Sequence, residues 1–399
     1  MRSSTNQRYT LTDRFIWIVT FAYLVIANTI NSTGAILFGF TLLVLVLTNF
    51  KLTIYKYHIF TLQFCLYCYF TMFWALNGRY SIAIANTIFQ TLMCLFVFYE
   101  YWKNIKDINI LLKIQMWAGF AVVMYTYFYY GVEDIVTAEG EDRLGNEFNN
   151  VNVVAMMTAL TLIINFYFML YVKKSWSVII WIPCLIIIGA TQCRKAFVML
   201  IIGMFMLFYF KQRRKAKGDM LLPLLKISLF ILIGIVILII LGKTNTFSGL
   251  FTRMEGLISS VTGGEDVDAS SMVRNNYLNI GWRQFLEKPL LGIGMNNSKI
   301  LLSMEAGHRT YLHNNYIELM ASGGIVGLVS YYSMFIYLLL KEKKYISLDS
   351  TAILFFTWIL IRFVTDWGAV SYCNRSTYFY LLIFFIHLDH MKKKYPHIK

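Results

Sequence analysis

The sequence predicts an all-α polytopic membrane protein with about 12 transmembrane helices and one large extracytoplasmic loop that contains short amphipathic helices. Of its 399 residues, 58% are hydrophobic and only 14% are charged, whereas a soluble domain is about 25% charged. Apolar runs of about 20 residues, enough to cross a bilayer as a helix, recur along the whole chain. Backbone groups in lipid must be hydrogen-bonded within their own segment, so uniformly apolar runs of this length indicate helices rather than barrel strands.

Twelve apolar segments are long enough to cross a bilayer when tilt is allowed for. They cover residues 15–30, 33–49, 57–76, 80–101, 109–130, 151–172, 175–191, 195–210, 221–242, 315–340, 349–367 and 375–390. We divide the chain accordingly into nine membrane helices (1–242), a large extracytoplasmic loop (243–313), and three membrane helices with a cytoplasmic tail (314–399).

The basic residues between these segments predict the orientation of the chain. With a cytoplasmic N-terminus and strict alternation, most of the 36 Lys and Arg fall in short cytoplasmic loops. The positive-inside rule then places both termini in the cytoplasm. A net charge of +15 is also typical of nucleic-acid-binding proteins, but here the charges are scattered over short loops, so we predict no nucleic-acid partner.

Two extracytoplasmic loops stand out, 131–150 and 243–313. Within the longer loop, 272–287 has the pattern of an amphipathic helix that ends before Pro289 and lies on the membrane surface. Its predicted apolar face consists of Leu278, Trp282, Phe285 and Leu286. The loop is too small for a deep core of its own, so any chemistry must use the membrane helices as walls.

Outward-facing basic residues oppose the charge pattern and are therefore candidate site residues. Arg194 stands at a helix start, where a guanidinium adds to the positive end of the helix dipole and can hold a diphosphate with two hydrogen bonds. Its neighbour Lys195 is expected to reach the lipid headgroups. Arg274 precedes the amphipathic helix and is expected to be a phosphate ligand. Arg143 and Arg253 fit either a phosphate contact or an exposed surface.

His313 stands where the polar loop leads into the apolar segment 315–340. A neutral imidazole can take a proton from a sugar hydroxyl, although an interfacial histidine can equally serve only as a hydrogen-bonding group. His308 and His313 together are too few ligands for a metal, so we predict no metal and no cofactor. Gly323 and Gly327 have the spacing of closely packed helices, and such packing would brace the start of the segment 315–340.

Arg362 and Asp366 are four residues apart near the outer end of the segment 349–367. An ion pair at this depth either braces the same site or is purely structural.

Four stretches of the chain form a recognisable combination: RLGNEFNNVNVVA (143–155), ATQCRKAFVML (190–200), RNNYLNIGWRQFLEKPLLGIGMNN (274–297) and HNNYIELMASGGIVGL (313–328). In order and position they resemble the O-antigen ligase and polysaccharide polymerase superfamily of bacterial membrane glycosyltransferases. The chain departs from the family pattern at Cys193, where serine is usual, at Lys195, where glycine is common, and at Val151, which replaces the proline of an Asn-Pro-Asn run.

The resemblance implies a GT-C-like enzyme with its active site at the outer face of the bacterial cytoplasmic (inner) membrane. The donor would be a sugar chain on undecaprenyl diphosphate, and the transfer would be inverting and metal-independent. His313 would act as the base on the acceptor hydroxyl, and Arg194 and Arg274 would hold the leaving diphosphate. The predicted substrate-binding residues are Arg143, Asn152, Arg253, Asn314, Tyr316 and Glu318.

The intact H-N-x-Y and G-G-x-x-G pattern of 313–327 favours a polymerase of O-antigen, capsule or exopolysaccharide, with another lipid-linked repeat unit as acceptor. An O-antigen ligase, which transfers to lipid A core, is the alternative. The chain-length regulator and the flippase of the same pathway are expected partners. A lipid-linked sugar flippase is a second alternative, but it should carry polar groups through the mid-membrane, and here they gather at one face.

Overall fold

The structure, a computed structural model, describes residues 9–29, 34–48, 53–105, 107–137, 144, 150–173, 175–216, 220–262 and 269–398. Sixteen α-helices and no strands occur in these parts of the chain. The predicted all-α fold is therefore confirmed.

Each of the twelve predicted membrane segments forms a helix. In chain order they are α1 (Leu11–Thr29), α2 (Gly34–Leu47), α3 (Lys56–Phe70), α4 (Gly78–Trp102), α5 (Ile108–Tyr130), α7 (Val151–Tyr167), α8 (Trp181–Ala190), α9 (Arg194–Lys215), α10 (Leu221–Gly242), α14 (Asn315–Glu342), α15 (Ser350–Asp366) and α16 (Arg375–Lys394). Seven are long and apolar enough to cross a bilayer: α1, α4, α5, α7 extended to Val172, α9, α10, and α14 extended to Tyr345. The chain is thus a polytopic membrane protein, and the count of twelve crossings stays a prediction.

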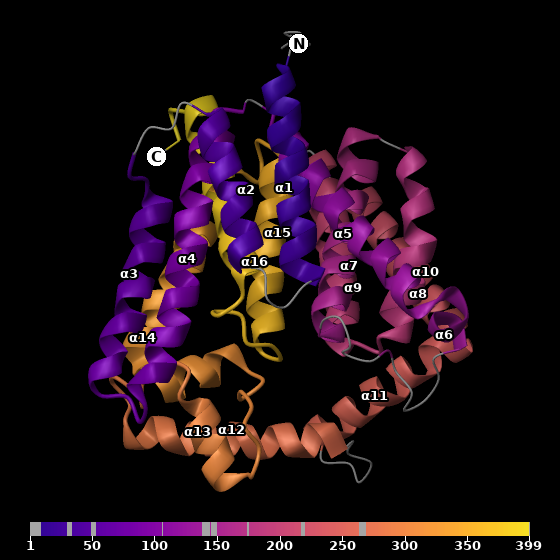
Figure 1. Ribbon diagram of the computed structural model, residues 1–399. Coiled ribbons are helices and arrows are strands. Elements are labelled where there is room, and N and C mark those ends of the chain that lie inside the picture. Colours follow the sequence, from indigo (N-terminus) through magenta and orange to yellow (C-terminus); the bar gives the residue numbers. More distant parts are fainter. Residues whose placement is uncertain are drawn as a thin grey trace.

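The remaining helices are α6 (Val132–Thr137), α11 (Asn245–Thr262), α12 (Ala269–Glu287) and α13 (Ser298–Glu305). Figure 1 shows the long helices in one bundle with both chain termini at the same end. α11, α12 and α13 lie across the opposite end (Figure 1), where α12 contacts α14 and α11 contacts α8 and α9. The described part of the predicted loop 243–313 is therefore mostly helical and covers one end of the bundle.

Several helices that begin at the covered end have asparagine N-caps, and those of α7 and α14 lie closest to the predicted site residues. α7 packs against α5, α8 and α9, and Asn150 Oδ1 at its start accepts a hydrogen bond from the backbone N–H of Asn152 at 3.0 Å. At the start of α14, Asn314 Oδ1 accepts from the backbone N–H groups of Tyr316 and Ile317 at 2.9 and 3.1 Å. Asparagine suits this position because its oxygen satisfies N–H groups that the first helical turn leaves open. The caps fix where the side chains of both first turns point.

α14 is broken at Gly324, which has a φ of 61° and a ψ of −166°. The turn 289–293 fills the break. The backbone N–H of Ile325 donates to Pro289 O at 2.8 Å, and the N–H of Ile293 donates to Ala321 O at 3.1 Å. A Cβ at Gly324 would lie 2.2 Å from the carbonyl oxygen of Leu290. Only glycine fits here, because the backbone is left-handed and another backbone approaches so closely.

Gly323 and Gly327 pack closely against α3, as their spacing predicted. A Cβ on either residue would lie 3.3 or 3.0 Å from Cε1 of Tyr67, whose hydroxyl also donates to the carbonyl oxygen of Gly323. The pair therefore holds α3 against α14 below the start of that helix, and the predicted bracing role is confirmed.

The predicted helix 272–287 is confirmed as α12. Tyr277 and Ile280 are buried, whereas Trp282 and Leu286 of the predicted face are 47% and 61% exposed. At Gly281, an added Cβ would be 2.6 Å from Cγ2 of Ile317. α12 crosses the start of α14 at this glycine, where the side chains of Ile317 and Leu312 come close to the α12 backbone. Trp282 and Leu286 point away from the protein.

Candidate active site

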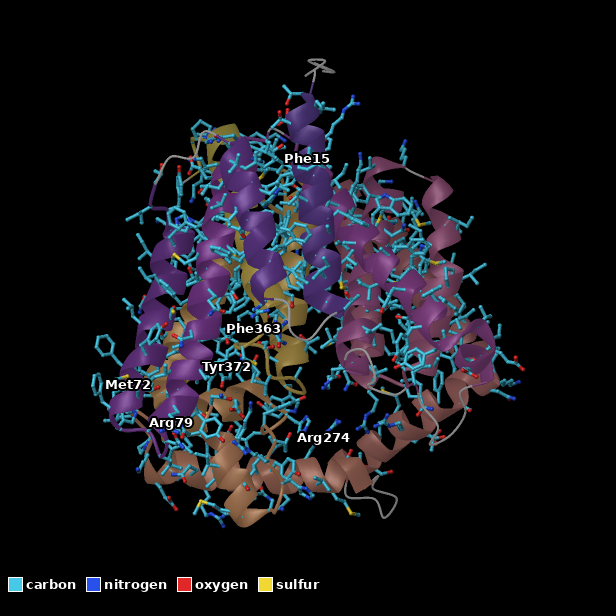
Figure 2. The ribbon with its side chains drawn as sticks, viewed as in Figure 1. Phe15, Met72, Arg79, Arg274, Phe363 and Tyr372 are labelled. Carbon is cyan, nitrogen blue, oxygen red and sulfur yellow. The ribbon has the colours of Figure 1, made fainter. Side chains whose placement is uncertain are left out.

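A cavity of about 690 Å³ lies where the bundle meets α11 and α12, and we call it the cation cavity. Its lining residues are Asn152, Gln192, Cys193, Arg194, Lys195, Val198, Arg253, Ser271, Arg274, Asn275, Leu278, Leu312, His313, Tyr316, Phe363, Val364, Thr365, Trp367 and Gly368. Six of the nine predicted site residues are among them: Asn152, Arg194, Arg253, Arg274, His313 and Tyr316. In Figure 2, Arg274 lies between α12 and the ends of the bundle helices.

The charge of the cation cavity has one sign. Arg194, Lys195, Arg253 and Arg274 line it, and none of its described lining residues is an Asp or Glu. In addition, α7, α9, α12 and α14 contribute residues of their first turns to the lining. Helix N-termini carry partial positive charge and unsatisfied N–H groups, so their convergence favours an anion.

Arg194 is the most enclosed of these cations, with 7% of its surface exposed. Its Nη1 donates to the carbonyl oxygen of Arg253 at 2.8 Å and to Ser271 Oγ at 3.3 Å. Arg253 Nη1 in turn lies 3.5 Å from the carbonyl oxygen of Gln192. The start of α9 is thereby tied to α11 and α12, which fixes the direction of the guanidinium.

Lys195 lies in the cavity lining rather than only at the lipid boundary expected for it. Its stem passes Gly368, where an added Cβ would lie 3.0 Å from Lys195 Cε. The missing side chain at Gly368 makes room for the lysine. The sequence shows Arg194 and Lys195 in tandem at a helix start, but the partner glycine lies on a distant segment, so this placement was missed.

His313 projects from the short turn before α14. Its φ of 58° is left-handed, a region that residues other than glycine occupy rarely. The imidazole is half-buried between two rings, with centroid distances of 6.2 Å to Tyr277 and 4.3 Å to Tyr311. Burial, together with the charges of Arg274 and Lys195, lowers the pKa of His313 to about 4. The imidazole is therefore neutral at pH 7 and has a nitrogen that can accept a proton.

Glu318 and Asn314 hold the turn that carries His313. Glu318 is buried and accepts hydrogen bonds from the backbone N–H of Leu312 at 3.0 Å and from the hydroxyl of Ser298. It ties the turn and α13 to the first turn of α14, whereas Asn314 caps the helix. The geometry gives both residues positioning contacts, and their predicted contact with substrate stays a prediction.

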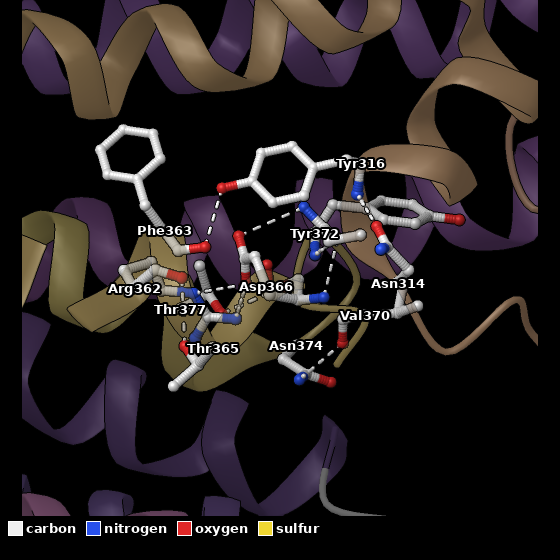
Figure 3. Close-up of polar contacts among 12 residues, drawn as sticks. Asn314, Tyr316, Arg362, Phe363, Thr365, Asp366, Val370, Tyr372, Asn374 and Thr377 are labelled. Atoms are coloured by element: carbon white, nitrogen blue, oxygen red, sulfur yellow. Dashed lines mark hydrogen bonds and ion pairs between the residues drawn. The ribbon is translucent and has the colours of Figure 1, made fainter. Parts of the chain in front are cut away.

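A buried polar network behind the cavity joins the start of α14 to the end of α15 (Figure 3). Asn315 Nδ2 donates to the Tyr332 hydroxyl at 2.9 Å, and Asn315 Oδ1 accepts from the backbone N–H of Ser371 at 2.8 Å. The Tyr332 hydroxyl donates to Asp366 Oδ2 at 2.9 Å, and Arg362 Nε donates to Asp366 Oδ1 at 2.8 Å. The predicted Arg362–Asp366 ion pair therefore exists, and neither residue lines the cation cavity.

Tyr316 connects this network to the cavity. Its hydroxyl donates to the carbonyl oxygen of Phe363 at 2.8 Å (Figure 3), and its ring stacks on Tyr332 at 4.8 Å between centroids. The cavity wall formed by α15 is thus fixed to the helix that follows His313.

Two further pockets adjoin the cation cavity. The outer pocket, about 560 Å³, is lined by Val273, Arg274, Tyr277, His308, Arg309, Thr310 and His313. The amide pocket, about 450 Å³, is lined by Ala83, Ile84, Thr87, Asn150, Asn152, Val153, Met156, Lys195, Asn296, Lys299, Tyr311, Glu318, Ala369, Val370, Tyr372, Cys373 and Asn374. The outer pocket shares Arg274 and His313 with the cation cavity, and the amide pocket shares Asn152 and Lys195.

Arg143, the remaining predicted substrate ligand, lies outside the described residues. Sequence reasoning missed Gln192, Ser271 and the two tyrosines that flank His313. Tyr277 lies three residues after Arg274 and so shares its side of α12, which was the one available signal. The others depend on how α11 and α12 lie across the bundle.

Residues 179–332 match the family model described as O-antigen ligase. This range extends from before α8 into α14, and it includes Arg194, Arg253, Arg274 and His313. No curated protein matches the chain. The match covers 154 of the 399 residues and supports the resemblance of the chain to the O-antigen ligase and polymerase superfamily, whose members are membrane glycosyltransferase-like enzymes.

Proposed function

We propose that the protein is a polymerase that joins undecaprenyl-diphosphate-linked oligosaccharide repeat units into a surface polysaccharide at the outer face of the bacterial cytoplasmic membrane. The observation that carries this proposal is the cation cavity. Four basic side chains and the first turns of four helices surround a space that also contains a half-buried, neutral histidine.

The cavity lining has a cationic part and an apolar part, and a lipid diphosphate matches both. The cations and helix starts suit the phosphates, because arginine forms strong paired hydrogen bonds with phosphate oxygens. Val198, Leu278 and Phe363 add apolar surface. Val364 and Trp367 of the lining are 44% and 70% exposed on the outside of α15, where a bilayer would cover them. The prenyl chain would leave the cavity along this edge.

The proposed transfer requires one proton acceptor and one stabilised leaving group. His313 takes the proton of the acceptor hydroxyl while that oxygen attacks C1 of the donor sugar, and the bond from C1 to the diphosphate oxygen breaks with inversion. Arg194 and Arg274 stabilise the negative charge on the departing diphosphate. Fixed donors aimed at developing charge lower a barrier by about 3–4 kcal/mol each.

Donor binding would also activate the base. The charges of Arg274 and Lys195 contribute to the low pKa of His313. A diphosphate bound between them offsets their charge, so the pKa of His313 rises when the donor is present. The imidazole then becomes a better proton acceptor in the complex that needs it.

The pattern of 313–327 supports the polymerase, whereas the printed description of the matched family supports the ligase as second candidate. The flippase alternative has no such support, because the matched family is of the ligase type and the cation cavity lies at one end of the bundle. Both termini lie at the end opposite α11–α13 (Figure 1), which supports cytoplasmic termini with an outward-facing cavity. A chain-length regulator and a flippase of the same pathway are the proposed partners.

The deciding experiment supplies purified protein in liposomes with its lipid-diphosphate repeat unit and separates the products on a gel. A ladder of lengthening lipid-linked chains would support the polymerase. No product from repeat units alone, but a single transfer after lipid A core is added, would make the protein a ligase. No transfer to either acceptor would overturn both proposals.

A further inference from the structure

The outer pocket adjoins the cation cavity at Arg274 and His313, which line both. Of the two pockets adjoining that cavity, it alone includes His313, whereas the amide pocket lacks it. The ring of Tyr277 forms part of the pocket and stacks on His313 with an interplanar angle of 13°. A molecule in this pocket would therefore face the same imidazole as a diphosphate in the cation cavity.

The outer pocket also carries a cation, Arg309, that pairs with no carboxylate among the described residues. Arg309 is exposed, and its guanidinium lies 5.3 Å from the centre of the Tyr80 ring. Among the described residues it forms no ion pair, and no Asp or Glu lines the pocket. By contrast, Arg283 on α12 forms an ion pair with Glu305 of α13. The aromatic contact orients Arg309 without cancelling its charge.

The proposed reaction has two substrates, and this assigns the outer pocket to the acceptor. The general base must contact the acceptor hydroxyl, while the donor diphosphate occupies the cation cavity. The acceptor must then occupy a space other than the one that the diphosphate fills, and the outer pocket, which His313 also lines, is such a space. The assignment of the acceptor to this pocket rests on the proposed function. The positive charge of the pocket is a property of the structure and does not depend on that proposal.

We propose that the outer pocket binds the acceptor end of a glycan and that this glycan carries an acidic sugar, whose carboxylate pairs with Arg309. An Arg–carboxylate pair supplies both affinity and orientation. The acceptor substrate is thereby assigned to an anionic class of saccharide.

Binding of trigalacturonate and of its neutral counterpart galactotriose tests the proposal. The full-length protein is placed in phosphatidylcholine nanodiscs, and binding is followed by saturation-transfer NMR. Trigalacturonate should bind saturably, and galactotriose should bind about tenfold more weakly or not at all. Arg309→Gln should remove this preference, and Arg309→Lys should keep part of it. Equal binding of the two sugars would overturn the proposal.

Arg283→Gln is the matched control, because it removes the same charge from the same end of the molecule but outside the pocket. If Arg283→Gln weakens trigalacturonate binding as much as Arg309→Gln does, the binding is unspecific attraction to a basic protein and the proposal fails. Thermal unfolding of each variant shows that it is folded.

Inhibition of the liposome reaction separates this inference from the proposed function. Trigalacturonate should suppress chain extension by the wild type, and about tenfold more should be needed with Arg309→Gln. If the wild type extends chains and trigalacturonate has the same effect on both proteins, the acceptor assignment is overturned while the polymerase stands. If no transfer occurs but Arg309-dependent binding persists, the proposed function and the acceptor role fail, and the acidic-saccharide site remains.

Discussion

At the scale of single residues, the proposed chemistry depends on groups whose direction is fixed by the protein. Arg194 is held by a backbone carbonyl and a serine hydroxyl, and His313 is held between two aromatic rings. Such preorganised groups act in a transition state without first having to rearrange. Replacing them should therefore affect catalysis more than folding.

His313→Asn tests the base while sparing the backbone, because asparagine tolerates the left-handed conformation that His313 adopts. The variant should reach the membrane in normal amounts and lose about 10²–10⁴-fold in transfer rate, since no proton acceptor remains. The rate is measured in the liposome assay and the amount by immunoblot. Products of normal length and rate would remove His313 from the mechanism.

Arg194→Lys tests the guanidinium. A lysine keeps the charge but cannot donate to the carbonyl of Arg253, to Ser271 and to a diphosphate at once. We expect transfer to fall about 10²-fold. Arg213→Lys is the control, since Arg213 is exposed in the last turn of the same helix. Equal rates for the two variants would contradict the diphosphate assignment.

The pH dependence follows from the pKa of His313, which lies at about 4 rather than 6.5 in the free protein. The protonated imidazole cannot accept a proton, so kcat/KM should fall only as the pH drops through about 4. Arg274→Gln removes one of the charges that lower the pKa, and the acid limb should then move towards pH 6.5. An acid limb near 6.5 in the wild type, with no movement in the variant, would refute the effect of Arg274 on His313.

At the scale of elements, α14 is the part of the fold that the sequence described least completely. The G-x-x-x-G spacing predicted close packing against another helix, and Gly323 and Gly327 make that contact with α3. The break at Gly324 was not predictable, because it depends on the turn 289–293, which is distant in sequence and enters the helix through backbone hydrogen bonds. The face of α12 that packs against α14 was not predicted for a similar reason, since a glycine and not a large side chain marks the crossing.

Gly324→Ala tests the break. The added Cβ would meet the Leu290 carbonyl at 2.2 Å, and the left-handed backbone alone costs about 1–3 kcal/mol for alanine. We expect a clearly lower unfolding temperature in detergent, followed by tryptophan fluorescence. Gly234→Ala in α10, where nothing lies within 4 Å of the added Cβ, should leave the unfolding temperature nearly unchanged. Equal melting of both variants would show that the turn does not support α14.

At the scale of the whole molecule, hydropathy and charge predicted the bundle and located its helices within a few residues, because lipid imposes simple rules on length and composition. Six predicted site residues meet in one cavity. Arg194, Arg253 and Arg274 were identified as outward-facing cations that oppose the charge rule, whereas Asn152 and Tyr316 were implied by the family resemblance. Gln192, Ser271 and Lys195 were not assigned to the site because their places depend on how distant helices cross.

The orientation of the molecule predicts how two introduced cysteines should react. In a cysteine-free background, Ser303→Cys lies on α13, and Lys343→Cys lies just after the far end of α14. A membrane-impermeant maleimide added to intact spheroplasts should label position 303 and spare 343 until the membrane is opened. The reverse pattern would place the cation cavity in the cytoplasm and contradict an outer-face polymerase.

The turn inserted into α14 has a mechanical consequence. It bonds the segment after α12 to the middle of the helix that follows His313, so Arg274 and His313 belong to one jaw of the cavity. Asn152, Arg194 and Lys195 belong to the other jaw, which is formed by α7 and α9. If the jaws part to admit a bulky lipid-linked chain, the hydrogen bond from Arg194 to Ser271 of α12 has to break, while Arg274 and His313 move together. The width of the cavity can thus change while the position of His313 relative to Arg274 is kept.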